Sequence, residues 1–461
     1  MTSISELSSL QKTLNAAIDT FKAELAAQNM PELSLNTSKP HPIDDLAFIP
    51  TPAMFEARRA ALASLGLIKS LIQSPYDALT ANTWMVMEVA GVRLTAEIGL
   101  ASILGDSEEG LSIKEIAEKT GVDELKLERV LRLLITQGWF REPKQGYFAN
   151  NRLSNLIKKG LPGFHLATYM NELFMKVATN FPEMINHPDP EFRKNTDPLH
   201  TAFQLAYKTD ISYFGADGWL TKDPEEAVKF GQSMVAVGPT SDPGVVADFA
   251  WDEIAKDKDG IVDVGGGQGS LCCSLAAKYP NIKKFVVQDL PETREGAEAY
   301  IASKGLTGRV EFEVQDFFKP QQRKGKYVYV MQRVLHDWST EKGAIMIKQI
   351  RDVLNEDSCL LIVDTVIQPG VVSSEGQDLV QSLLKLNKSV YQPVPPPEFI
   401  PVDFGEASRI QHQINVALTA LCNSFERTLP QLQEMVELGG MKIKKVNATR
   451  GWASITEVVP A

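Results

Sequence analysis

A glycine-rich turn preceded by an acid is the first stretch of the chain whose residues could do chemistry. Residues 263–269 read DVGGGQG; they complete the β-branched run IVDV and precede the helical pattern SLCCSLAAKY. Glycines such as Gly265 and Gly267 let the backbone turn sharply and approach a ligand closely. The dinucleotide fingerprint GxGxxG would need glycine where this chain has Ser270. Asp263 would repel a pyrophosphate and attract a cation, so the turn favours a ligand of another kind.

Two further acids end the next two predicted strands. Asp289 in VVQDLP lies 26 residues after Asp263, and Asp316 in VQDFF lies 27 residues after Asp289. Ligands of open parallel sheets bind outside the carboxyl ends of the strands, so we expect the three acids to share one crevice. An acid after the second strand suits ribose hydroxyls. Asp316 with Phe317 suits an adenine ring. The set therefore predicts a site for a nucleoside with a cationic amino-acid arm and no phosphate.

An alternation of strands and helices must position these acids. After about residue 243, short β-branched runs alternate with helical patterns, which predicts parallel βαβ units. The fold class is thus α/β, with a doubly wound, Rossmann-like sheet. The predicted strands contain the runs IVDV, FVVQD, RVEFEVQD, YVYVM and CLLIVDTVI.

The N-terminal part is predicted to be mainly helical. An apolar stripe (Leu7, Leu10, Leu14, Ile18, Phe21, Leu25) has helical spacing and must dock on the chain itself or on a partner subunit. A Pro-rich connector follows over 29–52, and a second helix is expected over 54–72. We divide the chain into an arm and connector (1–75), a helical winged-helix dimerisation region (76–242) and a catalytic sheet domain (243–461). A Pro-rich insertion lies at about 386–405.

Residues 111–148 have the pattern of a winged helix-turn-helix. A short helix ends at Gly121, a second helix turns Leu127, Val130, Leu131 and Leu134 inward, and a wing spans 140–148. DNA binding is the first interpretation to weigh. The second helix carries Lys126, Arg129 and Arg132, but its acids match these bases, and the whole chain has a net charge of −11. Phosphate binding needs a basic surface, so a dimerising role is favoured.

Composition excludes several other classes. With 461 residues, 44% of them hydrophobic, the chain can bury large cores, and no run approaches the ~18–20 apolar residues of a membrane span. The four cysteines lack CxxC spacing, which argues against a zinc site and a disulfide framework. No metal is expected. The first residues lack the pattern of a signal peptide, so we predict a cytoplasmic protein.

Six motifs in order resemble the class I S-adenosylmethionine-dependent O-methyltransferases, specifically the plant and fungal caffeate O-methyltransferase-like family in its fungal secondary-metabolism branch. The resemblance covers nearly the whole chain, since that family also carries an N-terminal winged-helix dimerisation domain. It implies S-adenosylmethionine as cofactor, a small-molecule substrate and a homodimer, without nucleic-acid or membrane partners. The motifs are DVGGGQG (263–269), QDLP (288–291), QDFF (315–318), VLHDWS (334–339), LLIVDTVI (360–367) and SFERT (424–428).

The resemblance implies that His336 is a general base flanked by the acids Asp364 and Glu426. A phenol with a pKa near 10 is mostly protonated at neutral pH, whereas histidine titrates near 6.5 and can accept its proton as attack on the sulfonium methyl develops. A carboxylate on the other ring nitrogen would fix the tautomer. The alternative is a histidine packed on Trp338 with no catalytic role.

The cofactor site predicted from residues and resemblance together contains ten residues. They are Asp263, Gly265, Gly267, Asp289, Leu290, Asp316, Phe317, Gln332, Arg333 and Asp337. The family usually has Lys or Arg four residues before the histidine, and this chain has Gln332 there with Arg333 next to it. Cofactor affinity could therefore differ from that of relatives.

Substrate binding is predicted for helices between residues 165 and 240 and for the insertion. The candidates are Met170, Asn171, Phe174, Phe203 and Met234. A stripe of Met and aromatic residues is more often part of a core than of a ligand pocket, and for His165 a solvated or core role is favoured over contact with the pocket. The insertion lies between Asp364 and Glu426, and its prolines favour extended backbone. It is either a lid that shapes substrate choice or a surface loop.

Three functions remain open at this point. The first is methylation of a phenolic or enolic hydroxyl of a secondary metabolite by in-line displacement. The second is a pericyclase or dehydratase that binds S-adenosylmethionine without methyl transfer, as some fungal relatives do on polyketide-type substrates. In such relatives the histidine can be replaced, whereas His336, Asp337, Asp364 and Glu426 are all present here, which favours methyl transfer. The third is a winged-helix regulator.

Overall fold

The computed structural model describes residues 5–355, 358–372 and 391–461. They form two compact units. Unit 1 comprises Met1–Lys176 with Glu225–Pro239, and unit 2 comprises Val177–Pro224 with Thr240–Ala461. Residues 177–224, which the sequence division assigned to the helical region, belong to unit 2. The division into 1–75, 76–242 and 243–461 stays a prediction.

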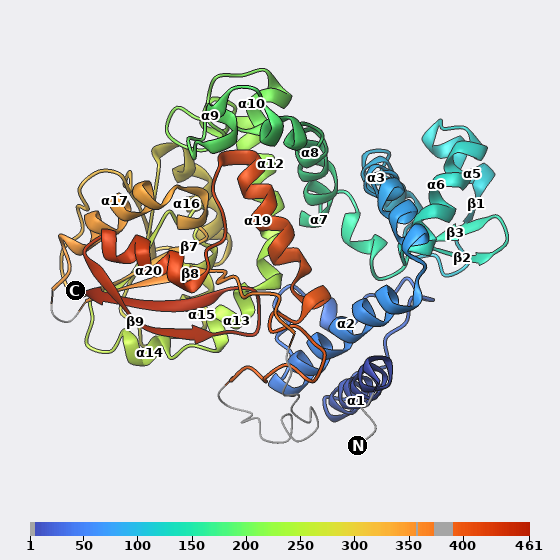
Figure 1. Ribbon diagram of the computed structural model, residues 1–461, viewed down its shortest axis with the longest axis horizontal. Coiled ribbons are helices and arrows are strands. Elements are labelled where there is room, and N and C mark those ends of the chain that lie inside the picture. The colour runs from blue at the N-terminus through green and yellow to red at the C-terminus, as the bar shows by residue number, and fades with distance from the viewer. Residues whose placement is uncertain (1–4, 356–357, 373–390) are drawn as a thin grey trace. The chain divides into compact units, whose positions relative to one another are not determined.

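Unit 2 is built on a seven-stranded sheet with the order β6-β5-β4-β7-β8-β10-β9 (Figure 1). The first five strands in that order are parallel, which confirms the predicted α/β sheet. The last two, β10 and β9, were not predicted: β10 runs antiparallel to β8, and β9 runs antiparallel to β10. The strands are β4 Gly260–Val264, β5 Phe285–Asp289, β6 Val310–Val314, β7 Tyr327–Gln332, β8 Cys359–Asp364, β9 Met441–Ala448 and β10 Ser454–Pro460.

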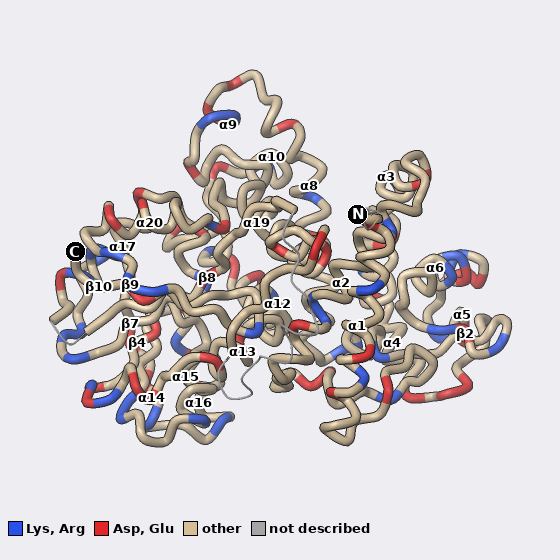
Figure 2. The backbone as a smooth tube through the Cα atoms, turned by 60° about the horizontal axis from the view of Figure 1, so that its bottom comes forward, with Lys and Arg blue, Asp and Glu red and all other residues tan. Residues whose placement is uncertain are grey.

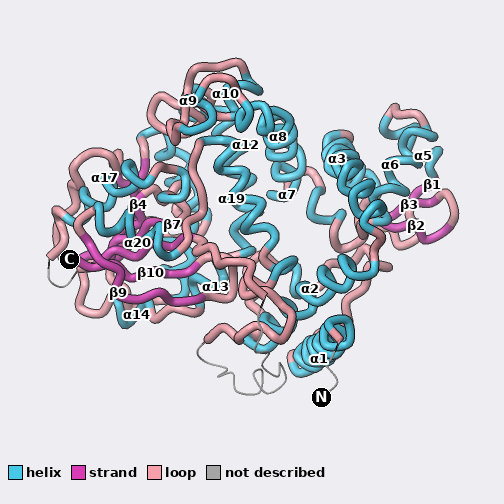
Figure 3. Tube along the Cα trace, in the orientation of Figure 1, coloured by secondary structure: helices cyan, strands magenta, loops and turns pink. Residues whose placement is uncertain are grey.

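Both faces of this sheet are covered by helices, as expected for a doubly wound fold (Figure 3). Side chains alternate along a strand, so β7 sends Val328 into one core and Tyr329 into the other. The helices α15 (Ser270–Lys278) and α16 (Arg294–Ser303) pack on the first core, and α17 (Thr340–Arg351) and α20 (Leu429–Leu438) pack on the second.

Six further helices in the described part of the chain belong to unit 2. They are α9 Pro190–Lys194, α10 Ala202–Tyr207, α11 Trp219–Lys222, α13 Asp242–Ala247, α14 Trp251–Ile254 and α19 Arg409–Cys422. The end of α19 is tied to the segment before α10, because the Asn423 side chain donates to the carbonyls of Asp197 and His200. Of the predicted insertion, residues 386–390 lie outside the described residues. The part from 391 onward packs inward, with Ile400 and Phe404 buried, and its Val402 N–H donates to the carbonyl of Val371. The lid hypothesis stays untested.

Unit 1 contains the predicted winged helix. A small sheet of β1 (Leu111–Ser112), β3 (Tyr147–Ala149) and β2 (Arg141–Lys144) lies beside α5 (Ile113–Thr120) and α6 (Glu124–Thr136). Leu127, Leu131 and Leu134 are buried as predicted, whereas Val130 is half-buried. The other helices are α1 Glu6–Ala27, α2 Pro52–Ile72, α3 Pro75–Glu97, α4 Leu100–Leu104, α7 Pro162–His165, α8 Asn171–Asn186, which continues into unit 2, and α12 Pro224–Val237.

The predicted N-terminal helix and connector both dock on unit 1. Helix α1 packs along α2, which buries Leu10 and Leu25 but leaves Leu7 and Ile18 exposed. The chain itself therefore covers only part of the apolar stripe.

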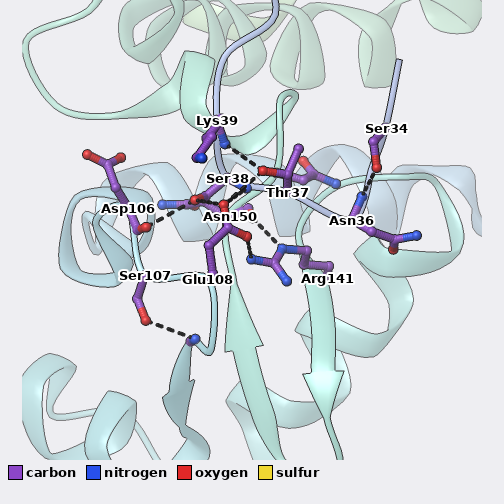
Figure 4. Close-up of polar contacts among 12 residues, drawn as sticks. Ser34, Asn36, Thr37, Ser38, Lys39, Asp106, Ser107, Glu108, Arg141 and Asn150 are labelled. Carbon is purple, nitrogen blue, oxygen red and sulfur yellow. Dashed lines mark hydrogen bonds and ion pairs between the residues drawn. The ribbon is translucent and has the colours of Figure 1, made fainter. Parts of the chain in front are cut away.

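The connector is held by one carboxylate (Figure 4). Glu108 accepts hydrogen bonds from Thr37 and Ser38 through one oxygen and from Arg141 through the other, at 2.6–3.1 Å. The Pro-rich connector is thus an ordered strap on the winged helix.

The structure also bears on the DNA-binding interpretation. Lys, Arg, Asp and Glu lie together on α6 (Figure 2). Arg132 pairs with Glu128 on the same helix and with Glu142 of the wing. These ion pairs neutralise a base that would otherwise face phosphate, which argues against the DNA-binding interpretation of this helix. Within the described ranges, no helix is both long and apolar enough to traverse a bilayer.

Candidate functional site

The glycine-rich turn after β4 has the backbone that only glycine adopts easily. Gly265 and Gly267 have φ values of 74° and 55°. A Cβ on Gly265 would lie 2.8 Å from Cγ2 of Val334 and 3.5 Å from the Phe317 ring. The turn is therefore tightly packed against the segments that follow β6 and β7, and a side chain at Gly265 would push them apart.

Asp263, at the end of β4, is a buried acid with an open acceptor. It is 2% exposed, and its Oδ1 has no hydrogen-bond partner among the described residues. Its Oδ2 lies 3.9 Å from the Cys272 thiol. Burial, with a smaller contribution from the charge of Asp289, raises the pKa of Asp263 to about 7. A bound cation would satisfy this carboxyl and favour its ionised form.

The other two predicted acids lie at the same sheet edge. Asp289 accepts hydrogen bonds from the Gly267 N–H at 2.8 Å and from the Leu290 N–H at 2.7 Å. Burial raises the pKa of Asp289, and these bonds oppose that shift. Asp316 accepts from the N–H of Phe318. Phe317, which follows Asp316, lies beside Gly265. The structure thus brings the ends of β4, β5 and β6 together, as predicted.

Gln332 and Arg333 converge on an acid that the sequence did not reveal. The Gln332 amide donates to Asp242 Oδ1 at 2.7 Å, and the Arg333 guanidinium donates to the same oxygen at 2.9 Å. The charges of Arg333 and Asp242 act on the pKa of the buried Asp263 in opposite directions, Arg333 lowering it and Asp242 raising it. Gln332 Oε1 is buried without a partner in the described chain. Asp242 begins a short helix, where an acid is ordinary, so no sequence signal singled it out.

His336 lies in a three-residue helical turn, η6 (Leu335–Asp337), directly after β7. Its Nδ1 is 2.8 Å from Glu426 Oε1, and its Nε2 is 3.7 Å from Asp337 Oδ1. Burial lowers the pKa of His336, but Glu426, Asp337 and Asp364 outweigh that effect and raise it to about 10. The ring therefore carries a proton at neutral pH in the cofactor-free protein.

The predicted acid Asp364 acts at longer range than Glu426. Its Oδ1 accepts from the backbone N–H of Arg333 at 3.0 Å, and no described hydrogen bond joins it to His336. Burial raises the pKa of Asp364 to about 7 and that of Asp337 to about 6, in each case against the charge of His336. Trp338, offered as a packing partner of the histidine, pairs with the rings of Phe317 and Phe318.

The loop 424–427 supplies residues whose role the sequence did not show. Ser424 and Arg427 bind backbone carbonyls of the turn that carries His336, and the side chain of Asn415 on α19 accepts from the N–H of Glu426. A cavity of about 360 Å³ opens beside this loop. It is lined by Ile367, Asn415, Val416, Thr419, Phe425, Glu426, Thr428 and Gln431.

The predicted substrate residues divide between the two units. Phe203 is fully buried among the rings of Tyr207, Tyr213 and Trp219, so it is a core residue of unit 2. The other four are half-buried in unit 1, whereas His336 belongs to unit 2, and their role in substrate binding stays a prediction. They are Met170, Asn171, Phe174 and Met234.

Comparison with known proteins decides the family. Residues 198–390 match the O-methyltransferase domain, and residues 85–159 match the O-methyltransferase dimerisation domain. The chain belongs to the O-methyltransferase family. The O-methyltransferase tpcA of Aspergillus fumigatus is 25% identical over 99% of this chain and 97% of its own length. The O-methyltransferase cicE of Emericella nidulans is 27% identical over 90% of this chain and 81% of its own length.

Solved structures confirm the fold of this O-methyltransferase-family chain. The structure of LepI in complex with SAM has a TM-score of 0.70 at 19% identity and covers 87% of this chain and 93% of its own. A structure described as a pericyclic reaction enzyme has a TM-score of 0.69 at 17% identity, over 97% and 99% of the two chains. The fold thus occurs in enzymes with different chemistry.

Proposed function

We propose that this chain is an S-adenosylmethionine-dependent O-methyltransferase that methylates a phenolic or enolic hydroxyl of a small secondary metabolite. The observation that carries the proposal is the His336–Glu426 pair, which follows β7 at the same sheet edge as the glycine turn. Family membership and the fungal relatives support the same reaction class.

The residues at the sheet edge fit S-adenosylmethionine. The open acceptor of Asp263 suits the cationic amino-acid arm, and Asp289 with Leu290 suits the ribose. Each carboxylate oxygen of Asp289 has lone pairs left after its bonds to backbone N–H groups. Asp316 and Phe317 would face the adenine, with Gln332, Arg333 and Asp337 nearby. When bound, the cofactor supplies an electrophilic methyl group on a sulfonium.

His336 would take the proton of the substrate hydroxyl through Nε2, because Glu426 holds Nδ1. In the free protein the raised pKa of His336 keeps the ring protonated, so the ring must lose this proton before it can act as a base. A cationic group bound near His336 would lower its pKa and favour the neutral imidazole that a base requires. Glu426 stabilises the imidazolium that forms.

A second candidate is a pericyclase or dehydratase that keeps the cofactor without methyl transfer. The imidazolium of His336, which can donate a hydrogen bond to a substrate carbonyl, favours it specifically. The structure of LepI with SAM and the structure described as a pericyclic reaction enzyme both have this fold, which agrees with either chemistry.

One assay separates the two candidates. The protein is incubated with S-adenosylmethionine and a panel of phenolic and enolic polyketide-type compounds, and the masses of the products are measured by mass spectrometry. Methyl transfer predicts a product gain of one methylene mass with equal S-adenosylhomocysteine. Conversion of a compound without S-adenosylhomocysteine would instead establish the pericyclase or dehydratase.

We further infer that the protein is a cytoplasmic homodimer. The match to a dimerisation domain supports the dimer. All four cysteines are free and buried, which agrees with a reducing compartment.

A further inference from the structure

Glu426 of the loop 424–427 binds the ring of His336. Two other side chains of this loop, Ser424 and Arg427, bind the backbone of the turn that carries His336. The Arg427 guanidinium donates to the carbonyl of Leu335 at 2.8 Å and to that of Trp338 at 2.6 Å. The Ser424 hydroxyl lies within hydrogen-bonding distance of the carbonyls of His336 and Trp338. Three carbonyls of one short turn are thus bound by the loop that also holds the histidine ring.

The turn itself partners the Leu335 carbonyl, to which the Trp338 N–H donates at 3.3 Å, but a turn of this length cannot do so for all of its carbonyls. Short helical segments leave their last C=O groups without internal partners, and water usually fills that role. Here the partners are protein groups out of reach of solvent, because Arg427 is 4% exposed and Ser424 is fully buried. The planar guanidinium presents its N–H groups at fixed angles, so two carbonyls bound by one fork cannot rotate independently.

The loop is itself fixed from the opposite side. The Glu426 N–H donates to Asn415 Oδ1 of α19 at 2.9 Å, and the Ile367 N–H after β8 donates to the carbonyl of Arg427 at 2.9 Å. These two hydrogen bonds therefore fix the positions of Glu426 and Arg427 relative to each other. One of them binds the ring of His336 and the other binds its backbone.

A purely structural role would not require an arginine here. Burial lowers the pKa of Arg427 to about 10, although Asp364, Glu426 and Glu341 oppose that shift. Burying a charge is costly, and an apolar side chain of similar volume often packs at equal or lower cost. An arginine at this position is explained by its guanidinium, which binds the carbonyls of Leu335 and Trp338 at the same time.

We propose that Arg427, with Ser424, is a positioning residue that holds the His336 ring against Glu426 and aims its Nε2 at the substrate. The consequence for turnover rests on the proposed function. The consequence for the Nδ1–H hydrogen bond does not, since it exists in the cofactor-free protein.

Arg427→Lys tests the proposal, because it keeps the charge and removes the fork. We expect kcat to fall ~10²-fold, as a displaced catalytic group does, with KM for S-adenosylmethionine and for the phenol changed by less than about threefold because Arg427 touches neither. In the cofactor-free protein, the downfield proton NMR signal of His336 Nδ1–H, assigned with His336→Gln, should disappear or broaden. Arg409→Lys, an exposed arginine paired with Glu406 in the same unit, should change none of these.

Wild-type kcat together with an unchanged Nδ1–H signal in Arg427→Lys would overturn the proposal, whatever happens to its melting temperature. If Arg427→Lys does not fold, the folded Ser424→Ala variant tests the positioning role instead. An altered Nδ1–H signal in folded Ser424→Ala supports the proposal, and an unaltered one rejects it. If no methyl transfer is found at all, the NMR result still decides the positioning role separately.

Discussion

At the scale of single residues, the proposed chemistry depends on how three carboxyl groups share one imidazole. Glu426 binds Nδ1 directly, Asp337 lies near Nε2, and Asp364 acts through its charge. Only the neutral ring can accept a proton, so kcat/KM should rise with pH towards the raised pKa of His336, which is about 10 in the free protein.

Glu426→Gln tests this electrostatic account. Glu426 makes the largest contribution that raises the pKa of His336, so its removal should move the ascending limb of kcat/KM to lower pH by roughly 1–2 units. Glu437→Gln is the matched control, because Glu437 is an exposed glutamate at the end of α20 whose carboxylate accepts a hydrogen bond from Gln433 at 2.7 Å. A limb at the same pH in wild type and Glu426→Gln would contradict the account.

We expect Asp263 to lower the stability of the folded protein and to strengthen cofactor binding. Its folded pKa, about 7, is above that of an unfolded aspartate, so its ionisation opposes folding. This penalty is absent below pH ~4, grows with rising pH and is complete above about 7. Asp263→Asn should therefore stabilise the cofactor-free protein at pH 8 by roughly 2–4 kcal/mol.

The same substitution should weaken binding of S-adenosylmethionine ~10–100-fold, because it removes a charge-assisted contact. Thermal unfolding and calorimetric titration measure the two effects. A variant that loses stability at pH 8, or that binds the cofactor as tightly as wild type, would disprove this role for Asp263.

At the scale of elements, the glycine turn after β4 depends on local packing as well as on backbone freedom. Gly265→Ala should cost about 1–2 kcal/mol for its left-handed backbone, plus the clash with Val334, and should abolish measurable cofactor binding. Gly121→Ala is the control, since its φ is 71° but its added Cβ meets open space. If Gly265→Ala and Gly121→Ala lose the same free energy of unfolding and both still bind cofactor, the clash with Val334 does not explain the need for glycine at position 265.

The elements also show what could be derived from the chain alone. The strands β4 to β8 and the acids that end them followed from β-branched runs and chain order. Strands β9 and β10 did not, because MKIKKVNA is largely polar and only its pairing with β10 shows that it belongs to the sheet. Asp242 and Arg427 were missed for a similar reason, since their partners are backbone groups or side chains far away in sequence.

At the scale of the whole molecule, the dimer should use apolar side chains that the chain leaves exposed. The first half of α3 exposes Tyr76, Leu79 and Trp84, of which Leu79 and Trp84 are 64% and 62% accessible. Such a patch is typical of an association surface. Leu79→Asp combined with Trp84→Asp should weaken dimerisation by at least ~2 kcal/mol.

Light scattering after size exclusion measures this effect. Leu199→Asp, at an exposed leucine of unit 2, is the control and should leave the dimer intact. A dimer dissociation constant that is the same in the double variant and the wild type, measured over a dilution series, would exclude α3 from the interface.

The central claim is that His336 is the base of a methyl transfer. The most direct measurement is the rate at which S-adenosylhomocysteine and methylated phenol form, with wild type and His336→Ala compared at saturating cofactor. We expect equal amounts of both products from wild type, a fall of ~10²–10⁴ in kcat for His336→Ala, and a cofactor affinity that changes little. His336→Ala turning over at the wild-type rate, or wild type converting its substrate without S-adenosylhomocysteine, would contradict the claim.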